Sequence, residues 1–126
     1  ATITITEINL ESTIKAGGIL LLDFWADWCG PCKAFGPVFE EAATRHPDIT
    51  FGKIDTQAEP GLASAFNVRA IPTVAVLRDG VLLAAQPGAL PAPALDALIE
   101  KVRELDMDEV RKQLDADSPP PPPMPS

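Results

Sequence analysis

The chain has little positive charge, few cysteines and no long apolar run. Its 126 residues include 10 Lys and Arg against 18 Asp and Glu, which gives a formal net charge of −8. Phosphate backbones and anionic lipid surfaces do not attract an acidic protein, so the charge argues against binding to nucleic acid or to a membrane. No stretch approaches the ~20 consecutive apolar residues that a membrane-spanning helix needs. We therefore expect a soluble protein without either kind of partner.

The N-terminal segment also lacks the features of an export signal. Residues 1–6 alternate Thr with apolar residues and contain neither a basic region nor an apolar core of signal-peptide length. The sequence therefore predicts a cytoplasmic protein. Two cysteines are too few for a disulfide scaffold, and a close pair in that compartment is more often catalytic or metal-binding than structural.

What the chain does contain is a regular alternation of strand and helix patterns, in a length that fits one domain. Short apolar runs predict strands near the N-terminus and over 19–24, 49–55, 73–77 and 81–85. Helical spacing of apolar residues predicts helices over 9–16, from the cysteine motif to about 46, over 62–66 and over 95–105. The Asp79-Gly80 dipeptide predicts a hairpin. The fold class is therefore α/β, with a central mixed sheet, a parallel core plus an antiparallel hairpin, flanked by helices.

The composition changes after Leu105. Asp106 is suited to cap a further short helix, because Glu109 follows three residues on. The five prolines of residues 119–123 exclude a helix or an inner strand and favour an extended or disordered segment. That segment has the composition of a ligand for an aromatic groove, although a solvated tail is the simpler interpretation. We expect a domain over 1–105, a short acidic helical extension over 106–117 and a disordered proline-rich tail over 118–126.

Both cysteines lie in the pentapeptide Trp-Cys-Gly-Pro-Cys at residues 28–32. A strand that leads into a CxxC motif, which in turn opens a helix, is typical of a dithiol/disulfide redox site. Cys29 falls at or near the N-cap, where helical N–H groups and the helix dipole favour a thiolate. Cys32 lies one turn into the helix. We therefore predict that Cys29 is the exposed attacking nucleophile and that Cys32 is the buried resolving thiol.

Three other uses of a CxxC motif fit less well. A zinc site needs four ligands, and His46 is the one further nitrogen ligand, at the far helix end where we expect solvent. A c-type haem site needs His directly after Cys32, where the chain has Lys33. A purely structural disulfide across so short a loop adds little stability. We therefore expect no metal site.

Residues 23–33, Asp-Phe-Trp-Ala-Asp-Trp-Cys-Gly-Pro-Cys-Lys, resemble the active-site signature of the thioredoxin family, in its bacterial CGPC form. Segments 53–55, 71–73 and 88–90 match further family segments in order and spacing. The resemblance covers about residues 4–105 and implies the thioredoxin fold. It also implies a protein-disulfide reductase without bound cofactor that receives electrons from NADPH through a flavoprotein thioredoxin reductase. Its partners would be that reductase and diverse disulfide-containing client proteins, and we expect a monomer.

The resemblance also gives roles to two charged residues. Asp23 ends an apolar strand, and burial would raise the pKa of its carboxyl group. It would then serve as the general base that takes the proton from Cys32, with Lys53 nearby to tune it. From the pattern alone, an exposed strand end is the alternative for Asp23, and an ordinary surface lysine is the alternative for Lys53.

The resemblance further implies a client-docking surface around a cis peptide bond before Pro72. Most X–Pro bonds are trans, so the local sequence alone favours trans. In the family the loop that holds this proline pairs with an extended client segment, which is a form of strand addition. Core packing is the alternative for the tryptophan of this set. The docking residues implied are Trp28, Gly30, Pro31, Ala70, Ile71, Pro72 and Gly88.

Two alternative functions remain. One is a disulfide oxidase or isomerase of the same fold, which the Gly-Pro pair between the cysteines and the lack of an export signal disfavour. The other is a binding or assembly module that has the fold but no redox turnover. Substitution of Cys32 discriminates the second alternative, because only an enzyme would lose turnover and trap mixed disulfides.

Overall fold

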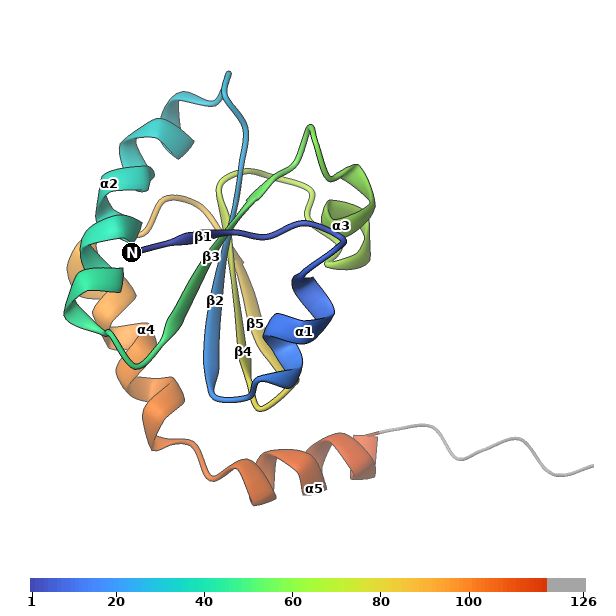
Figure 1. Cartoon of the computed structure of the whole chain (residues 1–126). Helices are drawn as coiled ribbons and strands as arrows, with labels where there is room; N and C mark the ends of the chain where they lie inside the picture. The colour runs from blue at the N-terminus through green and yellow to red at the C-terminus, as the bar shows by residue number, and fades with distance from the viewer. Residues whose placement is uncertain (118–126) are drawn as a thin grey trace, which may run out of the picture.

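The computed structural model describes residues 1–117. Its helices and strands follow the predicted order, and the last helix lies within residues 106–117, where a short helical extension was expected (Figure 1). The elements are β1 (Ile3–Thr4), α1 (Leu10–Lys15), β2 (Ile19–Trp25), α2 (Gly30–Arg45), β3 (Thr50–Asp55), α3 (Pro60–Ala65), β4 (Thr73–Arg78), β5 (Val81–Pro87), α4 (Ala92–Glu104) and α5 (Met107–Asp117). The proline-rich tail predicted over 118–126 lies outside the described residues.

The five strands form one mixed sheet in the order β1-β3-β2-β4-β5. β1, β3 and β2 run parallel, whereas β4 is antiparallel to both β2 and β5. The predicted parallel core with an added hairpin is therefore confirmed. At the hairpin turn, Asp79 and Gly80 have φ values of 50° and 83°, the positive values that such a tight turn requires.

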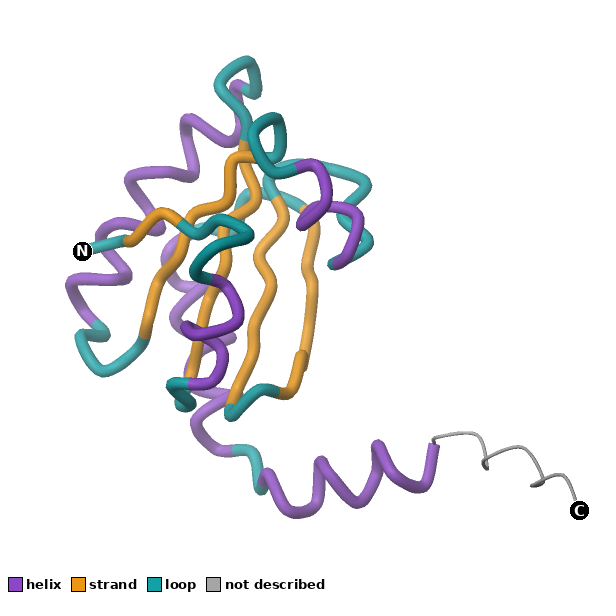
Figure 2. The backbone as a smooth tube through the Cα atoms, turned by 45° about the vertical axis from the view of Figure 1, so that its right-hand side comes forward, coloured by secondary structure: helices purple, strands orange, loops and turns teal. Residues whose placement is uncertain are grey.

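Helices cover both faces of the sheet, α2 and α4 on one face and α1 and α3 on the other (Figures 1 and 2). The central strand β2 supplies both cores, because successive strand side chains point to opposite faces. Leu21 packs with residues of α2 and α4. Leu20, Leu22 and Phe24 pack on the other face with residues of α1 and α3. Asp23 alternates with Leu22 and Phe24, so its side chain lies on the face that α2 covers.

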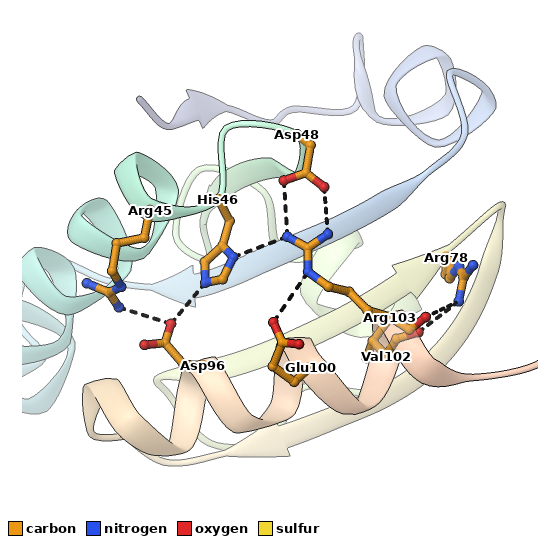
Figure 3. A network of polar contacts seen from close by, with 8 residues as sticks. All are labelled: Arg45, His46, Asp48, Arg78, Asp96, Glu100, Val102 and Arg103. Carbon is orange, nitrogen blue, oxygen red and sulfur yellow. Dashed lines mark hydrogen bonds and ion pairs between the residues drawn. The ribbon is translucent and has the colours of Figure 1, made fainter.

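The C-terminal end of α2 differs from the prediction. We expected His46 in solvent, but its side chain is only 14% exposed and lies in a polar network with α4 (Figure 3). Arg103 donates to His46 Nδ1 at 3.1 Å and also contacts Asp48 through two nitrogens. Because an arginine can only donate, Nδ1 is the acceptor, and Nε2 therefore carries the proton that it donates to Asp96 at 3.0 Å.

A second arginine holds the junction between α4 and α5. At the end of α4, Arg78 Nη1 donates to the carbonyl oxygen of Val102 at 2.8 Å (Figure 3). The same nitrogen donates to the carbonyl oxygen of Leu105 at 3.0 Å. Asp106 then caps α5, since its Oδ1 accepts from the N–H groups of Asp108 and Glu109. Figure 2 shows α5 leading away from the sheet after this junction. Within residues 1–117, no helix combines the length and apolar character needed to span a membrane.

Candidate active site

The cysteine pair lies where β2 gives way to α2. Cys29 is the N-cap residue of α2, with φ −88° and ψ 108°, and its Sγ accepts from the N–H of Cys32 at 3.2 Å. The two cysteines form a disulfide, with their Cα atoms 5.2 Å apart. The predicted N-cap position is therefore confirmed. A cap of this kind stabilises negative charge on Sγ once the disulfide is reduced.

The predicted difference in exposure between the two cysteines is wrong for this disulfide form. Cys29 and Cys32 are each 4% exposed. Cys29 is buried because the loop that contains Ile71 covers it. The Ile71 carbonyl oxygen lies 3.7 Å from Cys29 Sγ. The neighbouring residue Trp28, in contrast, is 68% exposed. The alternative that Trp28 packs in the core is therefore also wrong.

Asp23 is a fully buried carboxylate, which excludes the exposed strand end that its pattern allowed. Neither carboxyl oxygen has a hydrogen-bond partner within residues 1–117. This burial raises the pKa of Asp23 from 3.8 to about 6, and the charge of Lys53 limits the rise. Lys53 Nζ lies 3.9 Å from Asp23 Oδ2 and 5.4 Å from the centre of the Trp25 ring. Lys53 is thus no ordinary surface lysine.

The loop opposite the disulfide contains the predicted cis bond between Ile71 and Pro72. Two contacts hold its shape. Gly88 donates its N–H to the Pro72 carbonyl at 2.8 Å, from a φ of 106° that favours glycine. Thr73 Oγ1 donates to the Ala70 carbonyl at 2.6 Å. The N–H groups of Ala70 and Ile71 donate no hydrogen bond within the described residues.

A shallow hollow of about 210 Å³ lies beside this loop, and we call it the Trp28 hollow. It brings together Trp28, Ala70 and Ile71 of the predicted docking set. Gly30 and Pro31 are exposed at the start of α2, and Gly88 is exposed next to Pro72. Sequence analysis did not identify the other lining residues, because no local motif marks them. They are Thr56, Ala63, Val68 and Arg69.

No group of three or more His, Cys, Asp or Glu side chains that could hold a metal ion occurs in the described part of the chain. The reactive and hydrogen-bonding groups described at this site are the disulfide, the buried carboxyl group of Asp23 and the N–H groups of Ala70 and Ile71.

The chain is similar in sequence and in fold to known proteins. The family model described as Thioredoxin matches residues 1–101. A putative thioredoxin 2 of Streptomyces coelicolor is 53% identical over 112 residues, which span 89% of this chain and 84% of the relative. The thioredoxin of Rhodospirillum rubrum is 42% identical over 91 residues, 71% of this chain and 88% of its own. Among solved structures, a single-site mutant of a thioredoxin from Halobacterium salinarum superposes with a TM-score of 0.76 at 35% identity, covering 83% of this chain and 92% of its own.

Proposed function

Since this chain belongs to the thioredoxin family, we propose that it reduces disulfides of client proteins through Cys29 and Cys32. Its fold is the thioredoxin fold, and it is a thiol-disulfide oxidoreductase with a redox-active disulfide. The observation that carries the proposal is the position of that disulfide, at the N-terminus of α2 and 3.7 Å from the backbone of the cis-proline loop.

The proposed reaction has two exchange steps. In the reduced protein, the Cys29 thiolate attacks one sulfur of a client disulfide, and the other client sulfur leaves as a thiolate. Cys32 then attacks Cys29 Sγ, the second client thiolate leaves, and the Cys29–Cys32 disulfide forms. Two electrons pass from the protein to the client. The structure corresponds to the oxidised end of this cycle.

Different groups assist the two exchange steps. The Cys32 N–H, 3.2 Å from Cys29 Sγ, stabilises the attacking thiolate. Asp23 is the general base that removes the Cys32 proton before the second step. Its burial on the face that α2 covers and its pKa of about 6 support this role. Lys53, at 3.9 Å, keeps that pKa from rising further.

The client segment docks on the surface between the disulfide and the cis-proline loop. The free N–H groups of Ala70 and Ile71 are available to an extended client backbone. Trp28, the most exposed aromatic side chain here, offers apolar contact. The proposed docking residues are Trp28, Gly30, Pro31, Ala70, Ile71, Pro72 and Gly88.

The proposed reaction also requires a source of electrons and a cellular location. Members of the family act with a reductase and with disulfide-containing clients, and they need no bound cofactor. For this chain we infer NADPH as the electron source, through a flavoprotein thioredoxin reductase, in the cytoplasm. The protein would act as a monomer, and its net charge of −8 supports the absence of nucleic-acid and membrane partners.

The test is NADPH-coupled reduction of a model protein disulfide, with a bacterial thioredoxin reductase supplied. Turnover that needs both cysteines is expected. The Cys32→Ser variant should lose turnover and accumulate a mixed disulfide between Cys29 and the client, whereas Cys29→Ser should form none. Should the wild type fail with the reductase and also with dithiothreitol as donor, the proposal is wrong and a binding module without redox turnover takes its place.

A further inference from the structure

The segment 66–70 separates two hollows beside the cis-proline loop. One is the Trp28 hollow. The other has a similar volume of about 210 Å³ and extends from this segment to Ala85 and Pro87 at the outer strand β5. We call it the β5 hollow. Both hollows border Ala70, whose N–H is free within residues 1–117. A client segment that pairs with the loop therefore has room for side chains on both sides.

Arg69 is the one charged side chain, among residues 1–117, that lines either hollow, and it lines both. It is exposed, and its Nε donates to Asn67 Oδ1 at 3.3 Å. Asn67 itself holds a left-handed conformation with φ 55° at the end of α3. The bond leaves the other guanidinium nitrogens of Arg69 available at the ridge between the hollows. Lys33 is also exposed close to the disulfide, but it lines neither hollow.

The position of Arg69 relative to Cys29 Sγ determines which side chain of the client contacts Arg69. Ile71 lies next to the reacting sulfur, because its carbonyl oxygen is 3.7 Å from Cys29 Sγ. Arg69 precedes Ile71 by two residues, a spacing that spans at most about 6.6 Å and is shorter here because the chain bends at Ala70 and Ile71. A client cysteine that reacts beside Ile71 therefore places Arg69 against a client side chain about two residues away.

We propose that Arg69 selects client disulfides that have an acidic side chain within about two residues of the attacked cysteine. This inference rests on the proposed disulfide-reductase function. The overall charge of −8 acts in the opposite direction, since it repels acidic clients. Ionic strength decides between the two effects. At physiological salt the Debye length is about 8 Å, so distant charges are screened while a contact with Arg69 is not. A contact of this kind, partly covered by the docked client, changes kcat/KM by about three- to fivefold.

The test compares two cystine-linked homodimeric peptides that differ at one position. In one the residue two places from the cysteine is Glu, and in the other it is Gln. The measured quantity is the Glu-to-Gln ratio of kcat/KM, with NADPH and reductase as the electron supply. The ratio cancels any general loss of activity that a variant causes. Peptides with the substitution before and after the cysteine report the direction in which the client docks.

The wild type should favour the Glu peptide by about three- to fivefold, and about 1 M salt should bring the ratio close to one. Arg69→Gln should remove the preference, and Arg69→Lys should keep most of it. The matched control Lys33→Gln removes an equal charge outside both hollows and should leave the ratio unchanged. Equal ratios for the wild type and Arg69→Gln, or loss of the preference in Lys33→Gln, would overturn the inference while leaving the reductase function intact. Failure of the wild type to reduce either peptide would overturn both.

Discussion

Asp23 and Lys53 are register partners on the adjacent parallel strands β2 and β3, and 3.9 Å separates Asp23 Oδ2 from Lys53 Nζ. Thirty positions of sequence separate the two residues, yet the sheet aligns them directly. The carboxyl group is fully buried, while the lysine side chain is 26% exposed. The pair therefore combines a buried carboxyl group, whose ionisation is costly, with a lysine that still reaches solvent.

Replacing Asp23 with Asn should stabilise the protein at neutral pH. Well below about pH 4 the carboxyl group is protonated in both states, so its ionisation costs nothing there. Between about pH 4 and pH 6 the folded state keeps a proton that the unfolded state loses, so the free energy of unfolding falls as pH rises. The full penalty, about 3 kcal/mol, persists above pH 6. Urea denaturation measured at several pH values should show that the free energy of unfolding of Asp23→Asn depends less on pH across this range than that of the wild type. The same pH dependence in both proteins would contradict the burial argument.

The same substitution should slow the second exchange step. Without the carboxylate, Cys32 must lose its proton to solvent, and we expect resolution of the mixed disulfide to slow by about tenfold near neutral pH. The measurement is single-turnover release of a client thiol from the mixed disulfide, followed between about pH 6 and pH 9. The difference from the wild type should shrink at high pH, where Cys32 ionises unaided. Rates that match the wild type throughout would remove Asp23 from the mechanism.

Replacing Lys53 with Met should raise the pKa of Asp23 beyond its present value, because the positive charge that favours the carboxylate is removed. The pH range over which stability falls should then extend upward by the same amount. Carbon-13 NMR titration of the Asp23 carboxyl group reads this directly. Lys112→Met on α5 is the control and should leave the titration where it is.

His46→Ala should lower stability without changing disulfide chemistry. It leaves Arg103 and Asp96 each without one of its hydrogen-bond partners, which costs about 1 to 2 kcal/mol. His46 lies 14 positions beyond Cys32 at the other end of α2, roughly 21 Å along the helix, so reduction rates should not change. Thermal melts measure the loss of stability, and client-reduction assays test whether the reduction rate stays unchanged. Arg111→Gln on α5 is the control and should fall within about 0.5 kcal/mol of the wild type.

Two truncations test the predicted division of the chain at 105 and 117. A chain that ends at Asp117 should keep the stability of the whole protein. A chain that ends at Leu105 loses Met107, which is 8% exposed, and should lose about 2 kcal/mol of stability. Both should retain full reductase activity, because the disulfide and the cis-proline loop precede the cut. A lower melting temperature for the chain that ends at Asp117 would show that residues 118–126 stabilise the domain.

The sequence by itself determined the features that depend on local backbone chemistry. The cap at Cys29, the turn at Asp79 and Gly80 and the cap at Asp106 all follow from neighbouring residues. The alternation of apolar runs likewise predicted the order of strands and helices. The cis bond before Pro72 was accessible only through the family resemblance, because local preference alone favours trans.

Only the tertiary structure decided what long-range packing sets. The sheet register placed Lys53 against Asp23, a proximity that the sequence indicated only through the family resemblance. The cis-proline loop covers Cys29, which is therefore as buried as Cys32. Solvent exposure, pKa and partner choice are properties of an assembled environment, so no window of neighbouring residues encodes them. The same reason hid the His46 network and the place of Arg69 between two hollows: each depends on segments that meet only after the chain has folded.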